Sequence, residues 1–201
     1  MSTAASERDR AAELAQSDPS EALNIARKIS DPWNRAQALA WVARYAQSKM
    51  SEIALCESRE AAQRTDDTYK QAAVLAWPLR AAIETSQHQL ATGILSDANL
   101  LLPKVEPLSS RASAAELLLN AVAPANPSIC APLLISIAAC CPAHEHWRAK
   151  RLHQTVLDFL VSLDGEGSER VAGTSPFSED LDRTSGRSAP GTKFKARPFF
   201  W

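Results

Sequence analysis

Glycine is almost absent from residues 1–164 of this 201-residue chain. The whole sequence has 6 glycines, and only Gly93 comes before residue 165. A β-hairpin needs residues with positive φ at its turn, and a phosphate-binding loop needs several glycines close together. Neither can be built from a single glycine, while alanine, the strongest helix former, is abundant. The sequence therefore predicts an all-α body.

The composition is that of a globular protein with no charge bias. Hydrophobic residues make up 45% and charged residues 22%, so a packed core is expected. Lys and Arg number 22 against 23 Asp and Glu, which leaves a net charge of -1. Because a nucleic-acid binder normally carries a basic excess, we expect no nucleic-acid partner.

The sequence also indicates a cellular compartment. The first ten residues contain no apolar segment of a secretory signal, and the longest nearly apolar run, 131–143, is too short to span a bilayer. The 4 cysteines lack the spacing of a disulfide framework. We therefore expect a cytoplasmic protein with reduced thiols and no membrane span.

Prolines divide the chain into helices. Asp18-Pro19 and Asp31-Pro32 each place a capping acid before a proline at the first helical position, which predicts helix starts near residues 18 and 31. Further breaks are expected near residues 65–67, 86–87, 103–107, 124–127 and 142. These breaks predict about nine helices.

Two prolines fall inside the predicted segments. Pro78 should kink the helix that Asp67 opens, because proline removes one backbone hydrogen bond. Pro132 is interpreted as marking a delayed helix start.

A repeat emerges when the sequence is shifted against itself by about 36 residues. The matching pairs include Asp31 with Asp67, Ala36 with Ala72, Leu39 with Leu75, Trp41 with Trp77, and Arg44 with Arg80. Each unit would have a first helix, about 31–47 or 67–85, and a second helix, about 51–64 or 88–101. One such hairpin cannot bury its own apolar face, so the units are expected to stack.

The aromatic, leucine and alanine spacing of residues 36–46, followed by 52–62, resembles a tetratricopeptide repeat. The resemblance covers about residues 10–102 and implies a right-handed stack of antiparallel helix pairs, an α-solenoid. It departs from the family in its spacing of 36 rather than 34 residues, and in having Val or Ala where a Gly is expected. HEAT-like or other α-solenoid repeats, and a fragment of a longer solenoid, remain open alternatives.

In tetratricopeptide-like arrays the first helices line a concave face where partners bind. The resemblance therefore implies a non-enzymatic module that binds a protein or peptide. The expected contacts are Trp41, Arg44, Lys70, Trp77 and Arg80. Each arginine lies three residues after its tryptophan and can stack on it, which suits an acidic or aromatic peptide. The alternative is that both tryptophans belong to the core between units.

A second hypothesis is a small metal-binding or redox-responsive protein that uses Cys140, Cys141, His144 and His146. Thiols and imidazoles suit zinc or copper, but this spacing matches none of the usual structural zinc patterns. Polar helix starts and buried thiols explain the same residues. We expect no cofactor.

Nothing in the sequence predicts catalysis. There is no Gly-x-Ser-x-Gly turn, and the cysteines have no obvious base partner. We expect neither enzymatic activity nor a small-molecule substrate.

The predicted domain boundary falls where the composition changes. Residues 1–164 form the expected helical-repeat domain, and residues 165–201 contain five of the glycines with few large apolar residues. We expect a disordered tail there, with a basic and aromatic terminus at 193–201 that could dock to a partner groove or touch an anionic surface.

Overall fold

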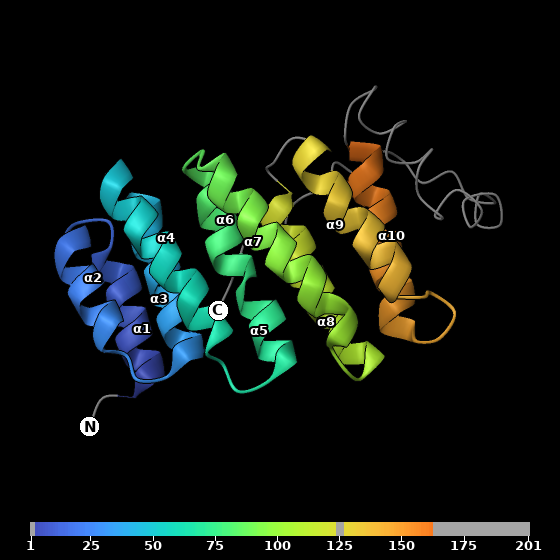
Figure 1. Ribbon diagram of the computed structural model, residues 1–201, viewed down its shortest axis with the longest axis horizontal. Coiled ribbons are helices and arrows are strands. Elements are labelled where there is room, and N and C mark those ends of the chain that lie inside the picture. Colours follow the sequence, from blue (N-terminus) through green and yellow to red (C-terminus); the bar gives the residue numbers. More distant parts are fainter. Residues whose placement is uncertain (1–2, 124–126, 163–201) are drawn as a thin grey trace. The chain divides into compact units, whose positions relative to one another are not determined.

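The protein is all-helical throughout the part that its computed structural model describes, residues 3–123 and 127–162 (Figure 1). These residues contain no β-strand, as the glycine distribution predicts. The chain divides into two compact units, Met1–Val105 and Glu106–Trp201.

The helices of Met1–Val105 are α1 (Ala4–Leu14), α2 (Pro19–Lys28), α3 (Pro32–Tyr45), α4 (Ser48–Gln63), α5 (Thr68–Val74), α6 (Ala76–Glu84) and α7 (His88–Leu101), followed by the 3-10 turn η1 (Leu102–Lys104). The helices of the second unit are α8 (Leu108–Val122), α9 (Pro127–Cys140) and α10 (Trp147–Ser162). With α5 and α6 counted as one interrupted helix, the described residues form nine α-helices, in agreement with the number expected.

Aspartates cap the helix starts that the sequence predicts. The Asp18 side chain accepts the Glu21 backbone N–H at the start of α2, and Asp31 accepts the Asn34 N–H at the start of α3. Asp67 caps α5 in the same way. Each carboxylate satisfies one of the backbone donors that a helix leaves without an intrahelical partner, so the prediction is confirmed.

Pro78 acts as expected and Pro132 does not. Helix α5 ends at Val74, and α6 begins at Ala76, two residues before Pro78, whose ring would clash with the Val74 carbonyl in a continuous helix. Pro132 lies inside α9, which already begins at Pro127, so the prediction of a delayed start was wrong. Pro132 is the sixth residue of α9, beyond the four backbone donors that a helix start leaves without partners, so it removes one intrahelical bond while the helix continues through it.

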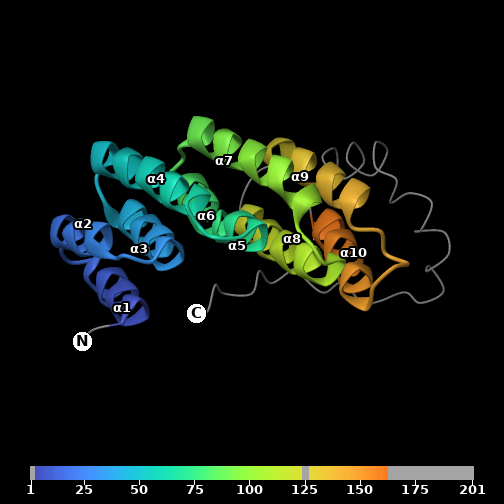
Figure 2. The same ribbon diagram turned by 60° about the horizontal axis from the view of Figure 1, so that its bottom comes forward.

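Helix α3 is the centre of the first unit. It contacts α1, α2, α4, α5 and α6, and Figures 1 and 2 show α4 alongside it. Alanines on α3, including Ala36 and Ala43, are fully buried and let α4 approach closely. The Ser58 hydroxyl donates to the Ala36 carbonyl at 2.7 Å, and the Ser51 hydroxyl donates to the Ala43 carbonyl at 2.6 Å.

The 36-residue shift relates contacts as well as residue types. The Arg35 guanidinium donates to the carbonyl of Ile29, six residues earlier, at 2.7 Å. Gln71, the residue one repeat later, donates to the carbonyl of Thr65, also six residues earlier, at 3.0 Å. Both side chains tie the start of a first helix to the end of the preceding helix.

The single glycine of the helical body has a packing role. Arg59 of α4 lies over Gly93 of α7 and forms a two-pronged ion pair with Asp97 at 2.5 and 2.8 Å. A Cβ atom at position 93 would come within 3.1 Å of the Arg59 guanidinium. The missing side chain therefore gives Arg59 room to cross to the next helix.

The second unit is held together by contacts of α8 with α9 and α10. Leu118 and Leu119 of α8 and Phe159 of α10 are among its largest buried side chains. At the edge of this core, Arg148 donates to the Ser113 hydroxyl and Arg151 pairs with Glu116, both at 2.8 Å.

The boundary expected after residue 164 and the expected tail at 165–201 lie outside the described residues. None of the helices that the structure describes is long and apolar enough to cross a membrane.

Candidate binding surface on α3 and α6

Two of the predicted site residues, Arg44 and Arg80, meet at one carboxylate. Arg44, in the last turn of α3, binds Glu84 through Nε at 2.6 Å and through Nη2 at 3.1 Å. Arg80 of α6 binds the same carboxylate through Nε at 2.5 Å. Glu84 of α6 therefore links α6 to α3 through Arg44, which lies 40 residues earlier in the sequence.

Aromatic rings lie beside this cluster. The Arg44 guanidinium sits 4.2 Å from the centroid of the Trp41 ring, so the predicted cation–π contact is present. The Trp41 ring also stacks on Tyr45, with centroids 6.1 Å apart and an angle of 12° between the planes. Tyr45 is exposed, and its hydroxyl accepts a hydrogen bond from Gln16. We call Trp41, Arg44, Tyr45, Arg80 and Glu84 the arginine–aromatic cluster.

The cluster gathers two guanidiniums at one carboxylate. Arg44 and Arg80 both bind Glu84 from within the chain. The side chains of Arg44, Arg80 and Glu84 are 25%, 24% and 26% exposed, so they remain within reach of a ligand. Because they are partly shielded from water, charge interactions here are stronger than on an open surface.

The two repeated tryptophans make different aromatic contacts. Trp77 makes an edge-to-face contact with Trp33 of α3, with ring centroids 5.9 Å apart. Trp41 is instead paired with Arg44 and Tyr45. Both rings are half-buried, so each also contributes to packing between helices, as the core alternative supposes.

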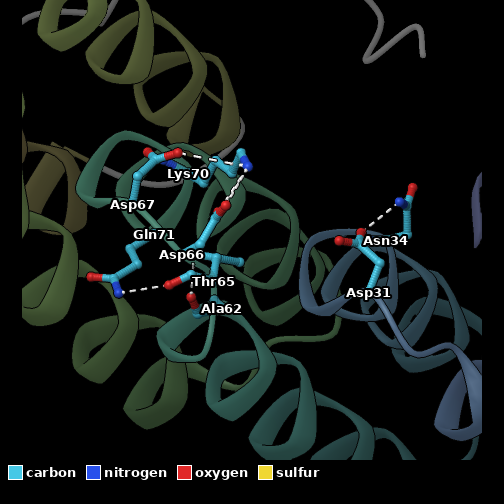
Figure 3. A network of polar contacts seen from close by, with 8 residues as sticks. All are labelled: Asp31, Asn34, Ala62, Thr65, Asp66, Asp67, Lys70 and Gln71. Atoms are coloured by element: carbon cyan, nitrogen blue, oxygen red, sulfur yellow. Dashed lines mark hydrogen bonds and ion pairs between the residues drawn. The ribbon is translucent and has the colours of Figure 1, made fainter.

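Lys70 belongs to a separate network at the start of α5 (Figure 3). Its ammonium group binds Asp66 at 2.7 Å and approaches Asp67 at 3.7 Å. The hydrogen bond with Asp66 raises the pKa of Lys70 and lowers that of Asp66. These contacts hold Lys70 at the start of α5, whereas Arg80 lies in α6, beyond the break at Leu75, so they do not bring Lys70 to the arginine–aromatic cluster.

Two members of the cluster were missed in the sequence. Glu84 follows Arg80 by four residues in the same helix, a spacing that commonly forms an ion pair. This contact could therefore have been predicted from the sequence. The bond from Arg44 to Glu84 could not have been predicted from the sequence, because it depends on how α3 and α6 pack. Tyr45 follows Trp41 by four residues, so the sequence could have predicted that the two lie side by side on one face of the helix.

The cysteine–histidine group of the second hypothesis is not assembled. Cys140 and Cys141 lie with their sulfurs 3.8 Å apart, but the His144 side chain is 84% exposed. His146 instead accepts the Arg148 backbone N–H through Nδ1. Within residues 3–123 and 127–162, no group of three or more His, Cys, Asp or Glu side chains is placed to hold one metal ion.

The arrangement on α3 and α6 is suited to non-covalent recognition. It offers guanidinium donors and aromatic faces, the groups that dominate many protein interfaces. Comparisons with protein-family models, curated protein sequences and solved structures found no match to this chain.

Proposed function

We propose that the protein is a non-enzymatic interaction module of stacked helix pairs, and that its arginine–aromatic cluster binds an acidic segment of a protein partner. The observation that carries the proposal is that Arg44 and Arg80 share the single carboxylate of Glu84. Both guanidiniums are also partly exposed, so a carboxylate from a partner would find charged donors on this surface.

The order of contacts within the first unit supports stacked, tetratricopeptide-like pairs. Between α3 and α4 the order reverses, since Ser51 bonds to Ala43 and Ser58 to Ala36, as in an antiparallel pair. Between α3 and α6 the order is kept, since Trp33 meets Trp77 and Arg44 meets Glu84. First helices of successive pairs run in the same direction in such a stack.

The same directional relation recurs between second helices. Gln87, just before α7, donates to the Ser51 hydroxyl near the start of α4, and Arg59 farther along α4 pairs with Asp97 farther along α7. Successive second helices therefore also run in the same direction, which supports a repeat of whole helix pairs. The arginine–aromatic cluster lies on first helices, the helices that would line the binding face.

The chemistry of the cluster favours an acidic segment that contains an aromatic residue. A guanidinium binds a carboxylate through two parallel hydrogen bonds, and Arg44 already holds Glu84 in this way. Trp41 and Tyr45 provide faces on which an aromatic side chain of the partner can pack. A basic segment would be repelled by the two guanidiniums.

The proposal is tested with a fluorescein-labelled octapeptide of Glu and Asp residues around one central Trp, titrated with the full chain in a fluorescence anisotropy assay. The double variant Arg44→Gln with Arg80→Gln should weaken binding at least about tenfold, because both charged contacts are lost. Gln is used because a new carboxylate would repel Glu84 and disturb the fold.

Lys70→Gln is the matched control, since it removes one cation that lies in a different network. It should change the affinity less than twofold, and raising the salt should weaken binding of the unaltered chain. Equal binding by the double variant and the unaltered chain, with unchanged helical circular dichroism, would remove the proposal. So would equal binding of a peptide in which Lys replaces every acidic residue.

A further inference from the structure

Two adjacent thiols lie side by side at the end of α9. The sulfur atoms of Cys140 and Cys141 are 3.8 Å apart and form a weak hydrogen bond. Cys141 is buried and Cys140 is half-buried, so the pair can be reached from the Cys140 side. The peptide-binding proposal does not use these residues.

The backbone that carries the two thiols is fixed from both neighbouring helices. Arg111 of α8 donates to the Cys140 carbonyl at 2.7 Å. Nε2 of His153, on α10, donates to the Cys141 carbonyl at 2.6 Å, since a carbonyl oxygen can only accept. Held carbonyls on consecutive residues limit the freedom of the chain between them, so the two sulfurs are preorganised.

The geometry is poorly suited to a disulfide. Consecutive Cα atoms are about 3.8 Å apart, whereas a relaxed disulfide joins Cα atoms roughly 4.4–6.8 Å apart. It is better suited to two thiolates on one ion. Sulfurs bound about 2.3 Å from a tetrahedral zinc-group ion stand about 3.8 Å from each other, close to the separation seen here.

We propose that Cys140 and Cys141 form a two-thiolate chelate for a thiophilic divalent ion of the zinc group. One ion replaces the two thiol protons, so that two metal–sulfur bonds form and two protons pass to solvent. Two coordination positions are left for water or for a ligand from outside the chain. Soft thiolates bind such ions in preference to calcium or magnesium.

The groups around Cys140 favour the thiolate form of its sulfur. The hydrogen bond from Cys141 and the positive charge of Arg111 lower the pKa of the Cys140 thiol, although burial acts against them. The hydrogen bond with Cys140 and burial raise the pKa of Cys141. Binding of the ion at both sulfurs releases both thiol protons.

The test uses the full reduced chain and Cd²⁺, whose thiolate complexes have an ultraviolet charge-transfer band. One Cd²⁺ per chain should bind with release of two protons, and Zn²⁺ should compete. Cys140→Ser and Cys141→Ser should each weaken binding at least about tenfold, because a single thiolate cannot chelate. Cys140→Ser alters a half-buried position, so it decides the question even where Cys141→Ser disturbs folding.

The other two cysteines are matched controls, one exposed (Cys56) and one buried (Cys130). Cys56→Ser, Cys130→Ser and the pair His144→Ala with His146→Ala should leave the Cd²⁺ titration unchanged. An unaltered band in Cys140→Ser, a band lost in Cys56→Ser or in the histidine variant, or the absence of any band in the unaltered chain would overturn the proposal. Peptide affinity should be unchanged in Cys140→Ser, so this proposal and the peptide-binding proposal fail separately.

Discussion

The two units of the molecule use similar contacts between helices but differ in the side chains that cap their helices. In Met1–Val105, side chains of Thr3, Asp18, Asp31 and Asp67 cap helices α1, α2, α3 and α5. In Glu106–Trp201, α8 starts after Pro107 with no side-chain cap bond, and α10 is capped by the His146 imidazole, which accepts the Arg148 N–H. The oxygen caps therefore encode the starts of α1, α2, α3 and α5 locally, whereas α4, α6, α7 and α8 begin without a side-chain cap bond.

Contacts between neighbouring helices nevertheless keep a similar spacing in both units. In the first unit, Arg59 pairs with Asp97 and Arg44 with Glu84, 38 and 40 residues apart. In the second, Arg148 reaches Ser113 and Arg151 reaches Glu116, each 35 residues away. The repeated aromatic residues are lost after the first unit, but side chains about one repeat apart still meet. Contacts between residues 35–40 positions apart therefore occur in both units, although the aromatic residues do not recur in the second.

The largest expected effect compares the two cores. Leu39 of α3 and Leu118 of α8 are 1% and 0% exposed. Replacing either with Ala leaves a cavity and should cost about 2–5 kcal/mol of unfolding free energy. Hydrogen exchange of α3 and α8 amides, together with urea unfolding, measures the two losses. A loss below about 1 kcal/mol in one unit would show that its core is loosely packed and would end the comparison.

The next effect depends on pH and belongs to the second unit. Burial raises the pKa of the Cys130 thiol from 9.0 to about 12. The unfolded chain therefore loses this proton near pH 9 while the folded chain keeps it, so stability falls as pH rises from about 9 to 12. The slope from this group is at most about 1.4 kcal/mol per pH unit.

Cys130→Ala should flatten the alkaline decline in unfolding free energy, measured by urea titrations at a series of pH values. Cys56→Ala, at an exposed position in the first unit, is the matched control and should flatten it less. Parallel curves for the unaltered chain and Cys130→Ala would contradict the expected burial of this thiol.

A smaller effect tests the capping difference. Asp67→Ala removes the acceptor for the Lys70 backbone N–H and should cost about 1 kcal/mol. Asp66→Ala removes only an exposed ion pair with the Lys70 side chain and should cost less. Thermal unfolding of both variants measures the difference. Equal losses would mean that the cap contributes nothing beyond the charge.

The smallest effect compares ion pairs of the two units by double-mutant cycles. Arg44 and Glu84 are partly shielded, whereas the Arg151 side chain is 55% exposed beside Glu116. The coupling should be about 0.5–1 kcal/mol for the first pair and below about 0.5 kcal/mol for the second. Urea unfolding of the single and double variants gives both values, and a larger coupling for Arg151 with Glu116 would reverse the comparison.

The local features of the fold were predictable, and those that depend on packing were not. Pro19 and Pro32 fix helix starts because proline suits the first helical position. Pro78 interrupts the helix that Asp67 opens because it lies in the interior of that helix. The Pro132 prediction failed because α9 begins at Pro127 and continues through Pro132 although that proline removes one backbone bond. The stacking of Arg44 on Trp41 followed from helical spacing.

The binding of Arg44 and Arg80 to the same residue, Glu84, could not be predicted from the sequence. It depends on α3 lying beside α6, and the repeat pattern alone does not say which acidic residue the two arginines would share. The same limit explains Lys70, which has the right charge but is bound by two aspartates at the start of its own helix.

The most direct measurement of the central idea is the affinity of the Glu84→Gln variant for the acidic octapeptide. Glu84 occupies both guanidiniums from within the chain, so a neutral amide should free them and strengthen peptide binding by about threefold or more. Asp97→Asn, which alters an ion pair on α7, is the control and should leave affinity unchanged. An unchanged or weaker affinity in Glu84→Gln would contradict the account, because the arginines would then serve only to join α3 to α6.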